Sequence, residues 1–118
     1  MDARTPEQVV ACFLGALGRH DLEAFRQVCA QDIVELLPGA PPMEGIEDAL
    51  AFAAALVAAF PDLEIEVTRV MAVDQVVAAE WIRRGTFTGV DFQGLPANGA
   101  RFDSPAAGFF EIENGVVK

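Results

Sequence analysis

Two periodicities follow one another along this chain, and their order constrains the fold more than any other feature. In the first half, apolar residues recur at helical spacing, as Val9, Phe13 and Leu17 do. In the second half, polar and apolar residues alternate, as in Glu64 to Val67, which is typical of a strand with one buried face. Helices followed by an antiparallel meander predict an α+β fold, with the helices covering one face of the sheet.

Capping and turn residues give the expected boundaries. Thr5 before Pro6 predicts the start of a first helix, which the Gly18 to His20 stretch ends. Asp21 can cap a second helix, over 22–30. A third helix, apolar nearly all round and therefore expected to be buried, spans 46–60. Strands are expected over 33–37, 63–73, 76–88 and 101–112, with a return strand starting at 116.

Composition limits the classes of protein to consider. The chain has 118 residues, of which 53% are hydrophobic, so we expect one globular domain over 1–118. Its net charge of −10 repels phosphate backbones and anionic headgroups, which argues against nucleic-acid and membrane partners. The longest apolar run, 49–60, is too short to span a bilayer. Cys12 and Cys29 lack a metal-binding spacing and are interpreted as buried, reduced thiols, so a cytoplasmic protein is expected.

Three stretches together resemble one family. They are HDLEAFRQVCAQDIVELLPG (20–39), FPDLEIEV (60–67) and EWIRRGTFTG with GLPANGARF (within 80–102). The chain is similar in them to the SnoaL-like polyketide cyclase group of the nuclear transport factor 2-like superfamily. The resemblance implies a cone, in which a curved, mostly antiparallel sheet wraps around three N-terminal helices and encloses a deep apolar pocket. It also implies a homodimer formed through the outer face of the sheet.

Two enzyme types of the same superfamily are argued against by the residues present. A ketosteroid isomerase needs a tyrosine, an aspartate base and a late acid, which would fall on Phe13, Leu37 and near Gly108 here. None of these groups can transfer a proton, and the chain contains no tyrosine. A limonene epoxide hydrolase needs an arginine and an aspartate where this chain has Trp81 and Arg83. Neither reaction is expected.

The cyclase type itself places a general acid on its final strand, beyond the position of Lys118. The strand that starts at Val116 is therefore short relative to the family. Two explanations stay open: the sequence stops before the end of the family's last strand, or the protein does without that acid.

Strand parity selects the remaining candidates. If Leu37 points inward, so does Glu35, and if Trp81 points inward, so does Arg83. Glu35 is then the expected general acid or base, with Arg83 orienting an enolate or carbonyl oxygen. The alternative is an ordinary ion pair between the two at the sheet rim. The same parity puts Ser104 inside.

The expected pocket is apolar and aromatic. Its predicted lining consists of Phe13, Leu17, Leu37, Phe52, Leu56, Trp81 and Phe110. Such a lining suits a flat, hydrophobic small molecule, here one that bears a carbonyl group. No cofactor and no metal site are expected, so any activity would be proton transfer of the cyclase or isomerase kind. The alternative function is a non-catalytic module for ligand binding or dimerisation.

Overall fold

The described part of the chain forms three helices and six strands. The computed structural model describes residues 4–38 and 40–118. In chain order the elements are α1 (Pro6–Gly18), α2 (Leu22–Gln27), β1 (Val34–Glu35), β2 (Met43–Glu44), α3 (Ile46–Ala59), β3 (Glu64–Val73), β4 (Val76–Thr86), β5 (Arg101–Glu113) and β6 (Val116–Val117). The predicted α+β class is confirmed. None of the described helices is long and apolar enough to cross a membrane.

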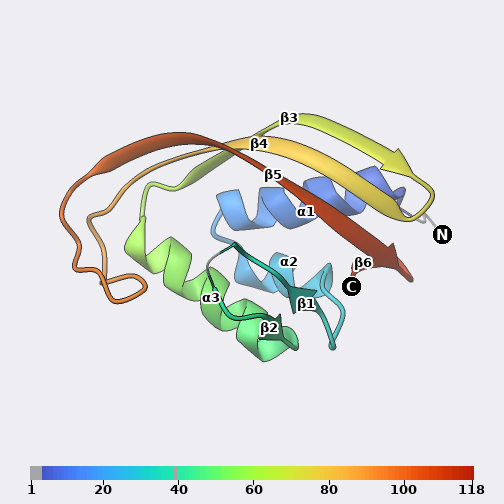
Figure 1. Cartoon of the computed structure of the whole chain (residues 1–118), viewed down its shortest axis with the longest axis horizontal. Helices are drawn as coiled ribbons and strands as arrows, with labels where there is room; N and C mark the ends of the chain where they lie inside the picture. The colour runs from blue at the N-terminus through green and yellow to red at the C-terminus, as the bar shows by residue number, and fades with distance from the viewer. Residues whose placement is uncertain (1–3, 39) are drawn as a thin grey trace.

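A four-stranded antiparallel sheet in the order β3-β4-β5-β6 forms the larger layer. Figure 1 shows its long strands arching over α1, with α2 and α3 below. The register of β3 on β4 shifts between Val67 and Arg69, and such a bulge bends a strand. The result is a curved sheet whose concave side faces the helices.

The first helix begins where its cap predicts. The Thr5 side chain accepts a hydrogen bond from the Gln8 N–H at 3.2 Å, and the Gln8 side chain accepts one from the Thr5 N–H at 2.8 Å. This reciprocal capping box satisfies two backbone donors that the helix itself cannot use. The face of α1 with Val9, Val10 and Leu14 is buried and packs on the sheet, where Gly18 allows close approach to Ile65.

Parity assigns each strand residue to the concave inner face or the convex outer face. Ile65 lies against α1, so its register partners Arg83 on β4 and Ser104 on β5 are on the inner face. Arg84 is on the outer face, where it binds Glu66 at 3.0 Å. Half-buried and exposed residues alternate along β5 in the same sense.

Val117 joins the end of the sheet to the helical layer. It pairs with Ile112 of β5 on one side and bridges Cys29 on the other. Its N–H donates to the Val28 carbonyl at 2.8 Å, and its carbonyl accepts from the Ala30 N–H at 2.7 Å. These bonds explain why α2 ends at Gln27 and not at residue 30 as predicted, because residues 28–30 pair with a strand.

Other boundaries also differ from the prediction. The strand expected over 33–37 is only β1, and its partner β2 was not expected at all. The two are aligned by the Gly45 N–H, which donates to the Ile33 carbonyl at 2.7 Å. The prediction that α3 is buried nearly all round is wrong. Its small apolar residues are divided between a buried face and an exposed one, so Ala53 is buried whereas Ala51 and Ala55 are exposed.

Within residues 4–38 and 40–118, the side of β5 away from β4 pairs with another strand only near β6, at Ile112 and Glu113. The Ile112 N–H donates to the Gln75 carbonyl, so the even-numbered residues of β5 bond to β4 and the odd-numbered ones point away from it. At the β6 end, the Glu111 carbonyl accepts from the Lys118 N–H. Pro105, which has no N–H to offer, lies farther along this edge, as is usual for proline in edge strands.

Candidate functional site

The side chain of Glu35 is partly buried in an unusual way for a carboxylate. It lies on β1 and is half-buried, and its Oε1 is shielded from solvent with no hydrogen-bond partner among the described residues. Burial raises the pKa of the Glu35 carboxyl above its usual value, because an ion loses hydration when it is enclosed. A carboxyl of this kind is ready to exchange a proton or to bond to a ligand.

A buried thiol lies close to this carboxyl. Cys29 is only 6% exposed, and its pKa is raised to about 12, first by burial and second by the negative charge of Glu35. The thiol is therefore neutral at physiological pH and is not a nucleophile. Its position also locates Glu35 near the end of the sheet where Val117 bridges Cys29.

The strand register places Arg83 on the inner face, but Arg83 forms no ion pair with Glu35. The ion pairs formed by the described residues include neither of the two. Only burial contributes to the raised pKa of Glu35, without any charge effect from Arg83. The structure therefore shows neither Glu35 and Arg83 side by side at one catalytic site nor an ion pair between them at the sheet rim. Arg83 is exposed, whereas its cross-strand neighbour Ser104 is half-buried.

The predicted lining divides into two aromatic groups. Phe13 lies 5.6 Å from Phe110, and Phe110 lies 6.0 Å from Trp81, measured between ring centroids. Leu17 is packed against the same core. Phe52 instead contacts Phe92, at 5.9 Å.

The second group is built around the end of α3 and the loop before β5. Phe60 is at its centre, 5.2 Å from Phe87, 5.7 Å from Phe92 and 5.0 Å from Phe102. Leu37 and Leu56, the remaining predicted lining residues, are half-buried. The aromatic surface thus extends along the molecule and does not form one compact set.

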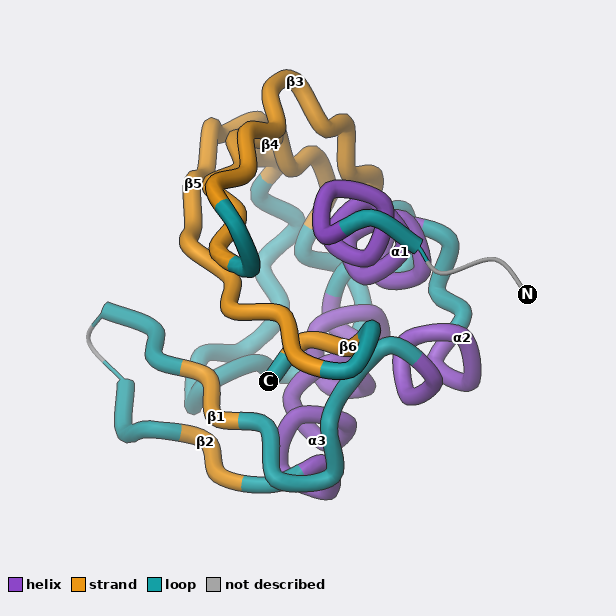
Figure 2. The backbone as a smooth tube through the Cα atoms, turned by 90° about the vertical axis from the view of Figure 1, so that its right-hand side faces the viewer, coloured by secondary structure: helices purple, strands orange, loops and turns teal. Residues whose placement is uncertain are grey.

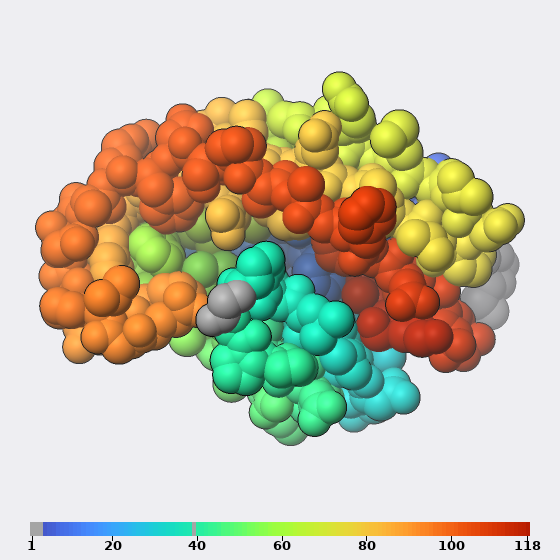
Figure 3. Space-filling view, viewed as in Figure 1, coloured from blue at the N-terminus to red at the C-terminus, as the bar shows by residue number. Residues whose placement is uncertain are grey.

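The inner face can be reached from outside between β5 and the β1–β2 hairpin. In Figure 3 a hollow separates these two segments, and atoms of α1 are visible in its depth. Figure 2 shows from the side that the hairpin stands apart from β5. Trp81, Ala106 and Phe110, all on the inner face, are partly exposed.

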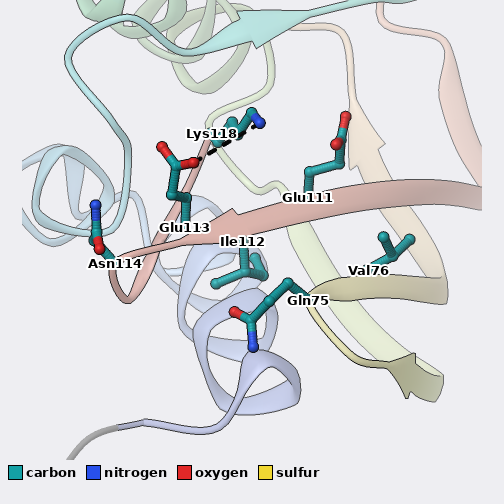
Figure 4. A pocket seen from close by; sticks show the side chains of 7 residues that line it. All are labelled: Gln75, Val76, Glu111, Ile112, Glu113, Asn114 and Lys118. Atoms are coloured by element: carbon teal, nitrogen blue, oxygen red, sulfur yellow. Dashed lines mark ion pairs between the residues drawn. The ribbon is translucent and has the colours of Figure 1, made fainter.

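A separate hollow of about 400 Å³ lies at the turn between β3 and β4. Figure 4 shows its lining residues Gln75, Val76, Glu111, Ile112, Glu113, Asn114 and Lys118, with Lys118 3.9 Å from Glu113. It is open to solvent and does not include Glu35. In residues 4–38 and 40–118, no three His, Cys, Asp or Glu side chains converge in a way that could hold a metal ion.

Sequence reasoning did not select two residues that the structure places beside the candidates: Cys29 near Glu35, and Ser104 next to Arg83. Cys29 was interpreted only as a buried thiol, because its proximity to Glu35 depends on the bridge to Val117, far along the chain. Ser104 was placed inside by parity but was not selected as a site residue. The register that makes it the direct partner of Arg83 is the signal that could have found it.

Comparison with known proteins places the chain by sequence and by fold. The family described as a SnoaL-like domain matches residues 10–118. No match is found among curated proteins.

Solved structures are similar over nearly the whole chain. A candidate SnoaL-like polyketide cyclase from Jannaschia sp. CCS1 is 24% identical, with a TM-score of 0.84, 99% of this chain covered and 86% of that chain. A candidate polyketide cyclase from Pseudomonas putida KT2440 is 24% identical, with a TM-score of 0.86 and coverages of 97% and 86%.

A more distant likeness is to an epoxide hydrolase. The LEH-like epoxide hydrolase of M. tuberculosis is 19% identical, with a TM-score of 0.75 and coverages of 95% and 76%. At these identities the structural matches establish the shared fold, which hosts more than one activity. The family match extends over most of the sequence, and with it the curved sheet over three helices identifies this chain as a member of the SnoaL-like family.

Proposed function

We propose that this protein binds a small, hydrophobic, carbonyl-bearing molecule against the inner face of its sheet and moves a proton on it without a cofactor. The single observation that carries the proposal is the half-buried Glu35, whose Oε1 is shielded and lacks a partner. An unpaired buried oxygen costs roughly 1–3 kcal/mol, which a ligand can recover by bonding to it. The family match supports a small metabolite of polyketide type as the ligand.

The chemistry follows from the raised pKa of Glu35. A general acid or base is most effective when its pKa lies near the working pH, and burial shifts this carboxyl in that direction. As a carboxylate, Glu35 takes a proton from the carbon next to the ligand carbonyl and leaves an enolate. As an acid, it returns that proton to carbon or oxygen. The half-exposed Trp81 and Phe110 offer flat apolar surfaces for the rest of the ligand.

Deuterium exchange tests the catalytic part. We expect the protein to accelerate exchange of the α-protons of 2-tetralone, a flat bicyclic ketone, in D₂O, as followed by proton NMR. Glu35→Gln should lower the accelerated rate by at least about 100-fold, within the range of general acid–base catalysis, while the ketone still binds. Glu111→Gln is the matched control, because Glu111 is exposed at the separate hollow. Equal acceleration by the wild type and Glu35→Gln would contradict a catalytic role.

The alternative is a non-catalytic module that binds the same kind of ligand. It is favoured by the ion pairs of residues 4–38 and 40–118, none of which joins Glu35 to Arg83 or to another cation that could stabilise an enolate. In that case calorimetry detects binding of 2-tetralone, whereas its α-protons exchange no faster than in buffer. The pair of measurements therefore separates an enzyme from a binding protein.

A further inference from the structure

The inner face carries a second polar group, far from Glu35. Arg83 on β4 and Ser104 on β5 are direct register partners, so their Cβ atoms lie about 5 Å apart. On the other side of Arg83 the partner is Ile65, which is apolar. A cation and a hydroxyl thus lie side by side on a face that is otherwise apolar.

The neighbouring acids are turned away from Arg83. Glu66 and Asp103 lie on the outer face, where both bind Arg84, at 3.0 and 3.3 Å. Among the ion pairs of residues 4–38 and 40–118, Arg69 is also matched, with Glu80 on that outer face. Arg83 takes part in none of these ion pairs. A guanidinium that takes part in none of these ion pairs can form charge-assisted hydrogen bonds with an anion.

Arg83 and Ser104 lie too far from Glu35 to contact the same group of a ligand. Ser104 and Ile112 are eight positions apart on β5, which is a rise of about 26 Å in extended chain. Ile112 pairs with Val117, and Val117 bridges Cys29, the residue affected by the charge of Glu35. The Arg83–Ser104 pair therefore lies toward one end of the inner face, whereas Glu35 on β1 lies near the opposite end of the sheet.

We propose that Arg83 and Ser104 bind an acidic oxygen of the ligand, a carboxylate or an ionised enol, while the apolar body of the ligand extends along the inner face toward Glu35. The guanidinium supplies two parallel N–H donors to such a group, and the serine hydroxyl supplies a third. This inference rests on the proposed function and adds the substrate class: an elongated, apolar molecule with an anionic end and a carbonyl end.

Calorimetry with two shape-matched probes tests it. We use 2-naphthoate, which is anionic at pH 7, and 2-acetonaphthone, a neutral ketone of similar size. Arg83→Gln should weaken binding of 2-naphthoate about tenfold and Ser104→Ala about threefold, as expected for a charge-assisted and a neutral hydrogen bond. Binding of 2-acetonaphthone should change by less than about twofold in either variant.

Arg69→Gln is the matched control, because it removes the same charge from the outer face. It should leave the affinity for 2-naphthoate within about twofold of the wild type. An equal loss of affinity for 2-naphthoate in Arg83→Gln and Arg69→Gln would overturn the inference, since non-specific electrostatic attraction would then explain the binding. Binding of 2-acetonaphthone without binding of 2-naphthoate would also overturn the inference, but it would leave the proposed function intact. Binding of neither probe would overturn both proposals, and circular dichroism confirms that each variant is folded.

Discussion

At the scale of single residues, burial disfavours the charged form of the Glu35 carboxyl. Strand parity predicts that Glu35 and Leu37 share a side; β1 ends at Glu35, and both residues are half-buried. Parity could not reveal that Cys29 lies beside Glu35 or that Arg83 lies far from it. Those relations depend on how distant segments pair, which local sequence patterns do not encode.

The raised pKa of Glu35 makes stability depend on pH in a defined direction. The native state holds the Glu35 proton more tightly than the unfolded chain does. Protonated Glu35 therefore contributes most to stability below the unfolded pKa of about 4.5, and this contribution is lost as pH rises through the pKa of the native state. Glu35→Gln, which carries no charge, should therefore raise the free energy of unfolding at pH 8 by about 1 kcal/mol.

Urea denaturation at pH 8 and pH 4 measures this effect. The advantage of Glu35→Gln should shrink toward pH 4, where the wild-type carboxyl is also neutral. The exposed Glu111→Gln should show no such pH-dependent gain. A variant that is less stable than the wild type at pH 8 would show that Glu35 is favourably paired when charged.

Cys29 should be chemically silent in the folded protein. Its pKa of about 12, raised by burial and by Glu35, leaves almost no thiolate at pH 8, and the side chain is 6% exposed. In a Cys12→Ser background, in which Cys29 is the single thiol, iodoacetamide should label it more than about 100-fold more slowly than in 6 M urea. Mass spectrometry follows the reaction. Rapid labelling under native conditions would mean that this region opens readily.

At the scale of elements, the prediction succeeded where one segment determines its own structure. The start of α1 follows from Thr5 and Pro6, and the long strands follow from alternation. It failed where a distant partner decides the outcome. Residues 28–30 have a helical pattern but pair with Val117, and Met43–Glu44 becomes a strand only because β1 is beside it. The curvature that shapes the site belongs to this second kind, since it depends on a register shift at Val67.

Gly89 anchors the long loop before β5 to the end of α3. Its N–H donates to the Ala59 carbonyl at 3.0 Å, and a Cβ added at this position would lie 1.7 Å from the Ala58 oxygen. Gly89→Ala should therefore push the loop away from α3 and lower the free energy of unfolding by roughly 2–3 kcal/mol. Gly94→Ala, in open space with a φ of 80°, should cost only about 1 kcal/mol.

Thermal unfolding of the two glycine variants checks the contrast. The loop carries Phe92, which contacts Phe52 and Phe60, so the damage in Gly89→Ala should extend to that aromatic group. Equal losses in the two variants would mean that backbone strain alone matters and that the close approach to α3 does not.

At the scale of the whole molecule, the outer face of the sheet is unusually apolar at one end. Phe109 is 84% exposed and Val73 is 75% exposed, and Met71, Ala78 and Phe109 follow one another across three strands. An apolar patch of this kind on a convex sheet is typical of a protein contact surface. We propose that a second copy of the chain covers it.

Charge substitutions in the patch test this homodimer. Phe109→Asp should convert the protein to monomers, because it would bury an unpaired carboxylate in the contact. Leu95→Asp, which places the same charge on an exposed leucine of the loop before β5, is the control and should leave the mass unchanged. Sedimentation equilibrium measures the mass of each form. A wild type that stays monomeric at high micromolar concentration would contradict the proposal.

The two-sided pairing of Val117 has a consequence for how the molecule is made. The segment that carries Glu35 is held in place through residues 28–30, and these bond to a residue synthesised almost ninety positions later. On the ribosome, the helical part emerges long before its fastening strand does. The region around Glu35 therefore remains unassembled until synthesis has passed residue 117, and the nascent chain must keep its apolar helices soluble until then.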